Sequence, residues 1–395
     1  MGDRGEALHL AVALDGAGWH PAAWREPDAA PDRLFTAGYW TDLVREAERG
    51  LLDFVTIEDT FAMQSTGRTD RVGGRLDAVL IAARTGPATS RLGLVPTATT
   101  THTEPFHVSK SIATLDYVTQ GRAGVRVKVS GTSAEARAFG RRSIPDIRAG
   151  RRDDPEIARV REDLFDEAAD FVEVVRRLWD SWEDGAEIRD AATGRFIDRD
   201  RLHYIDFQGR WFEVRGPSIT PRPPQGQPLV TALAHARIPY RLAARAADLV
   251  YVTPQDLDGA RRIEREVRSE EAKAGRAGLP LHILADLVVF LDGEPGQAAR
   301  RKARLDELDG EAYTSDAAIF AGTPSELADL LLAWREVGMA GYRLRPGAIP
   351  HDLEAVTRRL VPELQRRNAF RTRYEEGTLR ARFGLQRPVN RYATV

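Results

Sequence analysis

Cysteine is absent from the 395-residue chain, and this absence excludes several kinds of chemistry. Without a thiol there are no disulfides, no thiolate metal sites, no iron–sulfur clusters and no cysteine nucleophile. Long apolar runs are missing too: none approaches the ~20 residues of a membrane-spanning helix. The first residues, MGDRGEALHL, also lack the apolar core of a signal peptide. We therefore expect a soluble, cytoplasmic protein that has no contact with a membrane.

An excess of charge of one sign is also missing. The chain carries 57 basic and 59 acidic residues, which gives a formal net charge of −2. Proteins that bind nucleic acids usually concentrate positive charge, so this balance argues against a polyanion as the main partner. Nearly all of the basic residues are arginines, a bias that we attribute to the coding sequence and not to function.

The short motifs of several enzyme classes are absent. The chain contains no HExxH, EF-hand loop, P-loop or GxSxG, so nothing in it specifies a hydrolase. His102 and His107 straddle the expected end of a strand and the start of a helix, which makes them a poor metal pair, and we expect no metal. Residues 15–18, DGAG, lack the third glycine and the immediate helix of a dinucleotide-binding fingerprint.

The most informative stretch that is present runs from residue 92 to residue 131. An apolar run, LGLVPTA, precedes a segment in which Val108, Ile112 and Leu115 recur at helical spacing, and a second apolar strand follows at 125–130. Strand, helix and strand in this order form a βαβ unit, which needs a parallel sheet covered by helices.

The same alternation runs along the whole chain. Strands are predicted to begin near residues 8, 54, 92, 125, 229, 249, 282 and 342, and the clearest helix covers 164–182. This alternation predicts an α/β fold, a (β/α)8 TIM barrel with insertions beyond its ~250-residue core. We expect a single domain, residues 1–395, with an insertion lobe at about 183–222 and a C-terminal tail at about 370–395.

In such a barrel the functional site lies at the carboxyl ends of the strands. Arg126 and Lys128 alternate on one face of the fourth strand and would point into the barrel, where two unpaired cations would be costly. We therefore expect at least one of them to meet an anionic ligand or a buried acidic partner. Two long loops, 17–38 and 131–156, are expected to cover the site. The other polar residues predicted at strand ends are His20, Glu58, Asp59, Thr99, Thr100, Thr101, His102 and His235.

Each of these residues also has a purely structural interpretation. Asp59 could cap a loop or pair with an arginine, and consecutive threonines suit strands and turns. A lone histidine such as His235 is more often a satisfied structural group than a functional one. From this set we select His102 and His20 as the predicted catalytic residues.

Six longer stretches carry a resemblance to a known family. They are GLLDFVTIEDT at 50–60, TTTHTEPFHVSKSIATLDYVTQGRAG at 99–124, EAADFVEVVRRLWDSWEDGA at 167–186, HYIDFQGRWFEVRGPSITPRPPQGQP at 203–228, AGTPSELADLLLAW at 321–334 and VPELQRRNAFRTRYEEGTLRARFGL at 361–385. In these stretches the chain resembles the bacterial luciferase-like flavin monooxygenases. It is most similar to the branch of nitrilotriacetate, EDTA and dibenzothiophene-sulfone monooxygenases.

The resemblance implies an activity and a set of partners. The activity is the oxygenation of a small organic substrate by O2 and reduced FMN, which a separate flavin reductase supplies. A homodimer is also implied, because related barrels commonly pair through early helices, here those expected near 40–50 and 77–83. No nucleic acid and no membrane are expected among the partners.

At the positions that bind flavin in the family, this chain matches in part. The resemblance makes Asp59 the acidic residue after the second strand, and Thr100 and Thr101 the hydroxyl residues after the third. On the fourth strand the family typically has Trp and Asn, where this chain has Val125 and Arg126.

Two further departures concern the flavin phosphate. Arg161 and Phe165 stand where the family often carries His and Tyr, and AHAR at 234–237 stands where it has a Gly-x-Ser-like phosphate loop. Because guanidinium groups bind phosphate bidentately, Arg126, Arg161, His235 or Arg237 are the predicted replacements. A deazaflavin is the alternative cofactor. The alternative function is a flavin-free homologue that acts as a non-catalytic or regulatory subunit.

Overall fold

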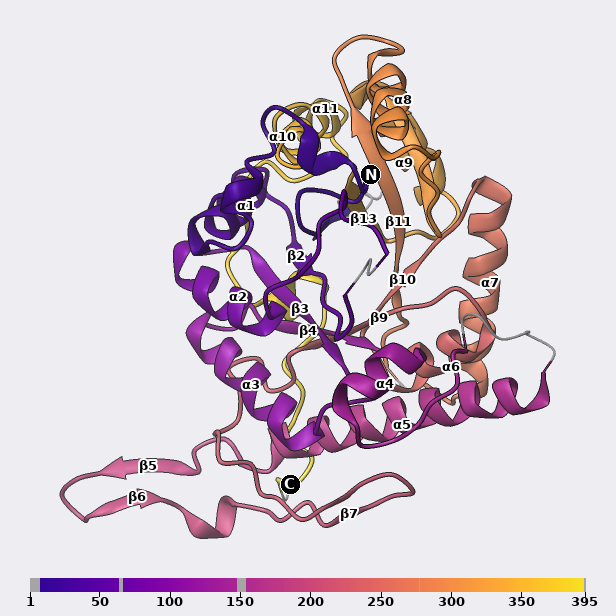
Figure 1. The fold of residues 1–395 in the computed structure, drawn as a ribbon. Helices are drawn as coiled ribbons and strands as arrows, with labels where there is room; N and C mark the ends of the chain where they lie inside the picture. The colour runs from indigo at the N-terminus through magenta and orange to yellow at the C-terminus, as the bar shows by residue number, and fades with distance from the viewer. Residues whose placement is uncertain (1–7, 64–66, 148–153, 277, 394–395) are drawn as a thin grey trace.

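A computed structural model describes residues 8–63, 67–147, 154–276 and 278–393. Eight parallel strands form a closed barrel at its centre, and the apolar runs of the sequence supply them (Figure 1). Strands of this kind are buried on both faces, which explains their nearly continuous apolar character. The barrel strands are β1 (His9–Leu14), β2 (Phe54–Ile57), β3 (Gly93–Thr99), β4 (Gly124–Lys128), β9 (Leu229–Leu233), β10 (Leu249–Val252), β11 (His282–Leu291) and β13 (Gly341–Pro346).

Two pairings complete the barrel, one between its first and last strands and one between β10 and β11. His9 of β1 lies in register with Gly341 of β13, and Leu249 of β10 lies in register with His282 of β11. The predicted TIM barrel is therefore confirmed, and each predicted strand start lies within one residue of the observed one.

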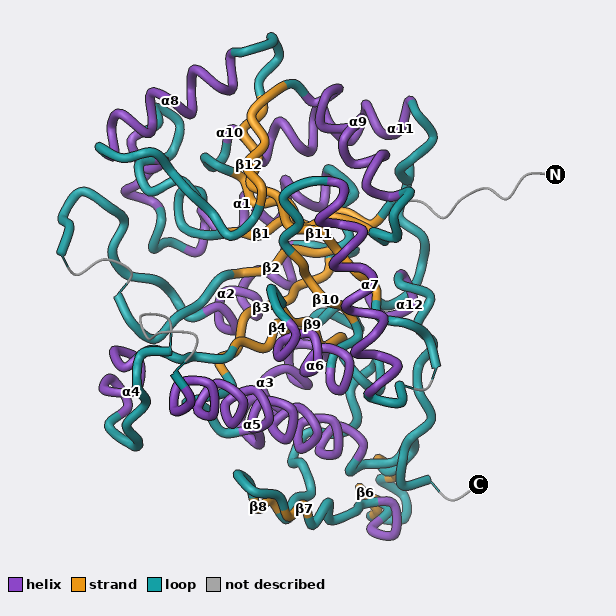
Figure 2. Tube along the Cα trace, turned by 90° about the vertical axis from the view of Figure 1, so that its right-hand side faces the viewer, coloured by secondary structure: helices purple, strands orange, loops and turns teal. Residues whose placement is uncertain are grey.

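Helices surround the barrel, as Figure 2 shows. The long helix α5 begins at Pro155, earlier than the periodicity predicts, because the side chain of Asp154 caps the backbone N–H groups of Glu156 and Ile157. No helix of the described residues is long and apolar enough to cross a membrane. The helices are α1 (Ala37–Arg49), α2 (Ala78–Thr85), α3 (Pro105–Val118), α4 (Ser133–Phe139), α5 (Pro155–Asp180), α6 (Arg237–Ala246), α7 (Leu257–Lys273), α8 (Gln297–Asp309), α9 (Pro324–Arg335), α10 (His351–Ala355), α11 (Val361–Arg366) and α12 (Leu379–Arg382).

Three features depart from the simple alternation of strand and helix. Strand β12 (Ala318–Gly322) pairs with the second half of β11 outside the barrel, and the sequence did not predict it. Between α5 and β9 lie two antiparallel ribbons, which Figure 1 shows below α5. The loop predicted over 131–156 contains α4, and its residues 148–153 lie outside the described residues. The ribbon strands are β5 (Glu187–Asp190), β6 (Arg195–Ile197), β7 (Phe207–Gln208) and β8 (Glu213–Val214).

The C-terminal tail closes the amino-terminal end of the barrel. Leu379 and Phe383 are buried there in one apolar cluster with Phe54 and Tyr251. Gly93 makes room for this plug, because a Cβ at this position would lie 2.6 Å from a methyl carbon of Leu379. The opposite end of the barrel, where the strands finish, is left for polar side chains.

Candidate functional site

The carboxyl ends of the barrel strands hold a buried group of charged side chains, which we call the charge cluster. Its five members come from four strands or their ends, and all are at most 8% exposed. Alternation along each strand aims these side chains into the barrel. The charge cluster consists of Glu58, Arg126, Asp286, Arg343 and Arg345.

Within the cluster every described arginine has an acidic partner. Glu58 Oε2 lies 2.5 Å from Arg126 Nη1, and Glu58 Oε1 lies 3.3 Å from Arg343 Nη1. Asp286 accepts hydrogen bonds from Arg343 Nε at 2.8 Å and Arg345 Nε at 2.9 Å. Burial by itself would raise the pKa of Glu58, but Arg126 and then Arg343 lower this pKa to about 2. The carboxylate is therefore charged at neutral pH.

Arg126 was expected to meet either an anionic ligand or a buried acidic partner, and it meets the partner. Its guanidinium also donates to Thr97 Oγ1 at 3.1 Å. His235, by contrast, is half-exposed between β9 and α6 and lies 3.1 Å from Thr253 Oγ1. Arg126 is thus held inside the barrel by Glu58, whereas His235 is half-exposed and lies 3.7 Å from Asp316.

Two polar atoms at this end of the barrel have no hydrogen-bond partner among the described residues. They are Arg126 Nε and His102 Nε2, and both are buried. The His102 ring stacks on Phe139 of α4, with 5.0 Å between ring centroids. Burial and then the charge of Arg142 lower the pKa of His102, which keeps its imidazole neutral. Buried polar atoms are normally paired, so each of these two could take one further polar partner.

Asp59, Thr100 and Thr101 join the loops around the mouth of the barrel. Asp59 accepts a hydrogen bond from the backbone N–H of Ala78 at 3.0 Å, which caps α2. Thr100 donates to the carbonyl of Lys128 at 3.2 Å, and Thr101 accepts from the N–H of Ser130 at 2.9 Å. These three side chains therefore fix the shape of the mouth, whatever they contact in addition.

His20 is held at both ring nitrogens. Its Nδ1 accepts from the N–H of Ala22 at 3.1 Å, and its Nε2 lies 3.0 Å from Asp306 Oδ1. Burial lowers the pKa of His20. The ring is therefore a neutral imidazole that ties the loop after β1 to α8, and it has no nitrogen left for proton transfer.

An open groove lies at the amino-terminal end of α6, and we call it the α6 groove. Its volume is about 750 Å³. The helix begins after Ala236, whose side chain cannot cap it. Arg161 donates a long hydrogen bond, 3.4 Å, to the carbonyl of Ile147, and Arg237 is largely exposed. The basic side chains that line the groove are Arg161, His235, Arg237 and Arg241.

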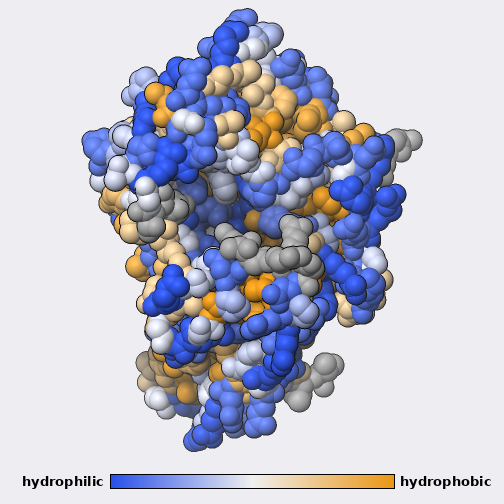
Figure 3. Space-filling model, turned by 45° about the vertical axis from the view of Figure 1, so that its right-hand side comes forward, coloured by the Kyte–Doolittle hydropathy of each residue, from blue (hydrophilic) through white to orange (hydrophobic). Residues whose placement is uncertain are grey.

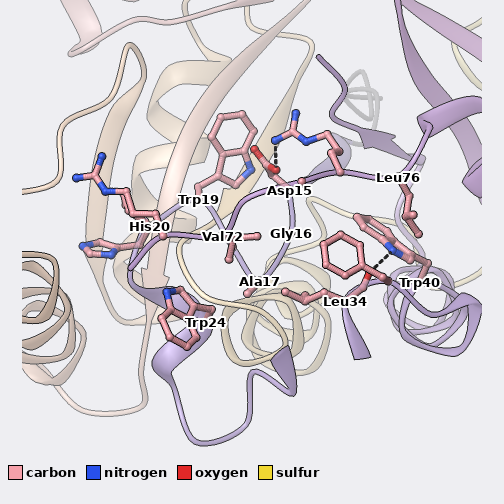
Figure 4. A pocket seen from close by; sticks show the side chains of 16 residues that line it. Asp15, Gly16, Ala17, Trp19, His20, Trp24, Leu34, Trp40, Val72 and Leu76 are labelled. Carbon is pink, nitrogen blue, oxygen red and sulfur yellow. Dashed lines mark hydrogen bonds and ion pairs between the residues drawn. The ribbon is translucent and has the colours of Figure 1, made fainter. Parts of the chain in front are cut away.

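A second pocket lies beside the end of β1 and is shown in Figure 4. We call it the tryptophan pocket, because Trp19, Trp24 and Trp40 line it together with Leu34 and Val72. Its volume is about 210 Å³. The sequence predicted a covering loop here but not a pocket, since the wall combines the 17–38 loop with residues 71–76.

The hollow visible near the centre of the face in Figure 3 is coloured mainly as hydrophilic. Histidine and carboxylate side chains nevertheless form no metal site: no group of three that could hold a metal ion occurs in the described residues.

Comparisons with known proteins agree with this architecture. A family model described as luciferase-like monooxygenase matches residues 17–341. N-acetyl-S-(2-succino)cysteine monooxygenase of Bacillus subtilis (strain 168) is 30% identical, with 100% of both chains covered. Nitrilotriacetate monooxygenase component A of Aminobacter aminovorans is also 30% identical, with 98% of both covered. The structure of EDTA monooxygenase from Chelativorans sp. BNC1 superposes with a TM-score of 0.83 at 23% identity, covering 97% of this chain and 99% of that one.

Proposed function

The chain belongs to the luciferase-like monooxygenases, and we propose that it oxygenates a small organic substrate with reduced FMN that a separate reductase supplies. The observation that carries the cofactor is the α6 groove. An uncapped helix end favours an anion, and the groove adds three arginines and a histidine. Glu162 also lines the groove, and the ion pairs there are long: Arg237 lies 3.5 Å from Glu270, and His235 lies 3.7 Å from Asp316. Guanidinium groups bind phosphate through paired hydrogen bonds, so this groove suits the phosphate of FMN.

The residues at the barrel mouth fit the rest of the cofactor. His102 Nε2 and Arg126 Nε are buried without partners among the described residues, and the polar edge of a flavin ring would satisfy them. Reduced flavin supplies the two electrons with which one atom of O2 enters the substrate while the other leaves as water. In this proposal Arg161, Arg237 and His235 hold the phosphate, and Asp59, Thr100 and Thr101 shape the ring site.

The protein would contribute cover and proton handling. Arg142 joins the loop after β4 to α5 through Glu167 at 2.9 Å, which draws this loop over the mouth. Lys128 Nζ donates to the carbonyl of Asp59 at 2.7 Å and keeps the loop after β2 in place. Such cover excludes water from the reaction. His102, whose Nε2 has no partner in the part of the chain that the structure describes, is the proposed proton acceptor or donor, and His20 is proposed as a positioning residue only.

Titration of the flavin-free protein with FMN and with riboflavin tests this proposal. Replacing Arg161→Ala should weaken FMN binding by about 10- to 150-fold, because a charged hydrogen bond to phosphate contributes about 1.5–3 kcal/mol. Riboflavin has no phosphate, so its affinity should stay unchanged. The matched control is Arg245→Ala at the other end of α6, where Arg245 pairs with Asp166 at 3.0 Å.

Three other results would be informative. Equal losses for FMN and riboflavin would mean that Arg161 does not hold the phosphate. If the protein binds a deazaflavin tightly and FMN weakly, the proposed cofactor is a deazaflavin and not FMN. If the wild-type protein binds neither cofactor, oxidised or reduced, the enzyme proposal fails and a flavin-free subunit takes its place.

A separate reductase and a homodimer complete the proposal. The name of the Aminobacter aminovorans relative describes it as one component of a monooxygenase, which supports a partner that supplies reduced flavin. For the dimer, α2 displays Leu80, 69% exposed, beside an apolar hollow of about 220 Å³. Trp40 of α1 lines the same hollow, so both α1 and α2 contribute to the proposed contact.

Light scattering at ~10 µM should therefore give the mass of a dimer, because this concentration is well above a nanomolar dissociation constant. Leu80→Glu places a charge on the proposed contact and should give a monomer. Phe196→Glu, which alters a side chain that is 65% exposed on β6, should leave the dimer intact. A wild-type protein with the mass of a monomer would contradict the proposal.

A further inference from the structure

The walls of the tryptophan pocket present indole faces and no indole donors. Trp19 Nε1 donates to the carbonyl of Ala13 at 2.9 Å, and Trp24 Nε1 donates to the carbonyl of Asp70 at 3.0 Å. Trp40 Nε1 is likewise bonded, to the carbonyl of Leu34 at 3.0 Å. Because every one of these N–H groups is already used, the tryptophans offer a ligand only apolar and π contacts.

The charged residues of the pocket are already compensated by neighbours. Arg75 is ion-paired with Asp15, and Arg71 Nε lies 3.0 Å from Asp309 Oδ1. His20, also in the wall, is bonded to Asp306. A ligand with several carboxylates would have to give up its hydration without gaining an unpaired cation from these side chains.

The size of the pocket limits its ligand. An engineered apolar cavity of about 150 Å³ binds benzene. The tryptophan pocket measures about 210 Å³, which leaves room for a benzene ring with a few further atoms. It is smaller than the roughly 300–1,000 Å³ of sites for drug-sized molecules.

The pocket also borders the mouth of the barrel. Asp15 directly follows the last residue of β1, and the Trp19 ring lies 4.5 Å from the guanidinium carbon of Arg345 in the charge cluster. Figure 4 shows Trp19, Asp15 and Trp40 gathered around the same space. A ligand in this pocket would therefore lie next to the strand ends at which we place the cofactor.

We infer that the substrate is a compact, uncharged aromatic molecule, about the size of indole or a substituted benzene. This inference rests on the proposed function, since it names the substrate class of the same site. The inferred substrate differs from nitrilotriacetate, the tricarboxylate that gives the Aminobacter aminovorans relative its name, even though that protein and this chain are 30% identical.

Calorimetric titration of the flavin-free protein with indole and with nitrilotriacetate tests the inference. Indole should bind with a Kd on the order of 100 µM, as expected for a ligand of this size, and nitrilotriacetate should not bind in this range. Val72→Phe narrows the pocket and should weaken indole binding at least tenfold. Leu76→Phe, in the same wall, is a second filling variant. Val389→Phe, at a position 80% exposed, is the control and should change nothing.

The outcomes separate this inference from the proposed function. The inference would be overturned if the protein binds nitrilotriacetate but not indole. It would also be overturned if the wild type and both filling variants bind indole with equal affinity, provided that circular dichroism shows the variants to be folded like the wild type. FMN titrated into the same samples tests the cofactor independently. If FMN binds and indole does not, only the substrate class fails. If indole binds and FMN does not, the oxygenase proposal fails while the pocket keeps its assigned ligand class.

Discussion

Replacing Asp286→Asn is expected to lower the free energy of unfolding by about 3–5 kcal/mol, because the change leaves two buried cations without their shared carboxylate. Asp286 is fully buried and accepts hydrogen bonds from Arg343 and Arg345, which are buried as well. Burial alone would lower the pKa of Arg343, and Asp286 is the main group that raises it, so the substitution removes the chief stabiliser of this buried charge. Urea denaturation of wild type and variant measures the loss.

A surface pair provides the matched control. Asp42 lies 2.7 Å from Arg33, and both side chains are exposed. Asp42→Asn should therefore change stability by at most ~1 kcal/mol. A double variant, Asp286→Leu with Arg343→Met, removes the carboxylate together with one of its two arginines, while Arg345 keeps Asp316 at 2.6 Å. This variant should recover much of the stability that Asp286→Asn loses. If the double variant is no more stable than Asp286→Asn, an unpaired charge is not the cause of the loss.

The barrel could be predicted from sequence because each of its strands is a local pattern. Apolar runs that alternate with segments of helical periodicity indicate eight βα units, and this pattern does not depend on long-range contacts. Strand β12 was not predicted because its sequence, AIFAG, is short and is only partly buried where it pairs with the second half of β11. The start of α5 was predicted too late in the chain because the capping side chain of Asp154, and not an apolar stripe, determines where this helix begins.

The charge cluster could be predicted only in part. Arg126 stood out because cations that alternate on a strand must point inward, and Arg343 and Arg345 on β13 carry the same signal. Asp286 is the single charged residue of the apolar run HILADLVVFL, which was a further signal. What the sequence does not contain is the pairing, since Asp286 and Arg343 are brought into register by the closure of the barrel.

Histidine roles show the same limit. His20 and His102 both follow strands in the sequence, and both were predicted as catalytic. The structure places Asp306, 286 positions away, against His20, whereas Nε2 of His102 is left without a partner among the described residues. Sequence position gave the two residues equal standing, and only the long-range contacts distinguish a structural imidazole from an available one.

The amino-terminal end of the barrel depends on the tail in the same long-range way. Replacing Phe383→Ala is expected to lower the free energy of unfolding by about 3–5 kcal/mol, because it opens a cavity in the apolar cluster that fills this end of the barrel. Phe383 is 1% exposed and stacks on His9 with 4.2 Å between ring centroids. The centroid of its ring lies 6.0 Å from that of Phe54. Urea denaturation measures the loss.

The same substitution at an exposed site is the control. Phe196→Ala removes an equal volume from the surface of β6 and should change stability by less than ~0.5 kcal/mol. Leu379→Ala, which shortens the other plug residue, should cost about 2–5 kcal/mol. Because Leu379 and Phe383 share one cluster, their double variant should cost less than the sum of the two. Equal stabilities of Phe383→Ala and Phe196→Ala would show that the tail does not fill the barrel in solution.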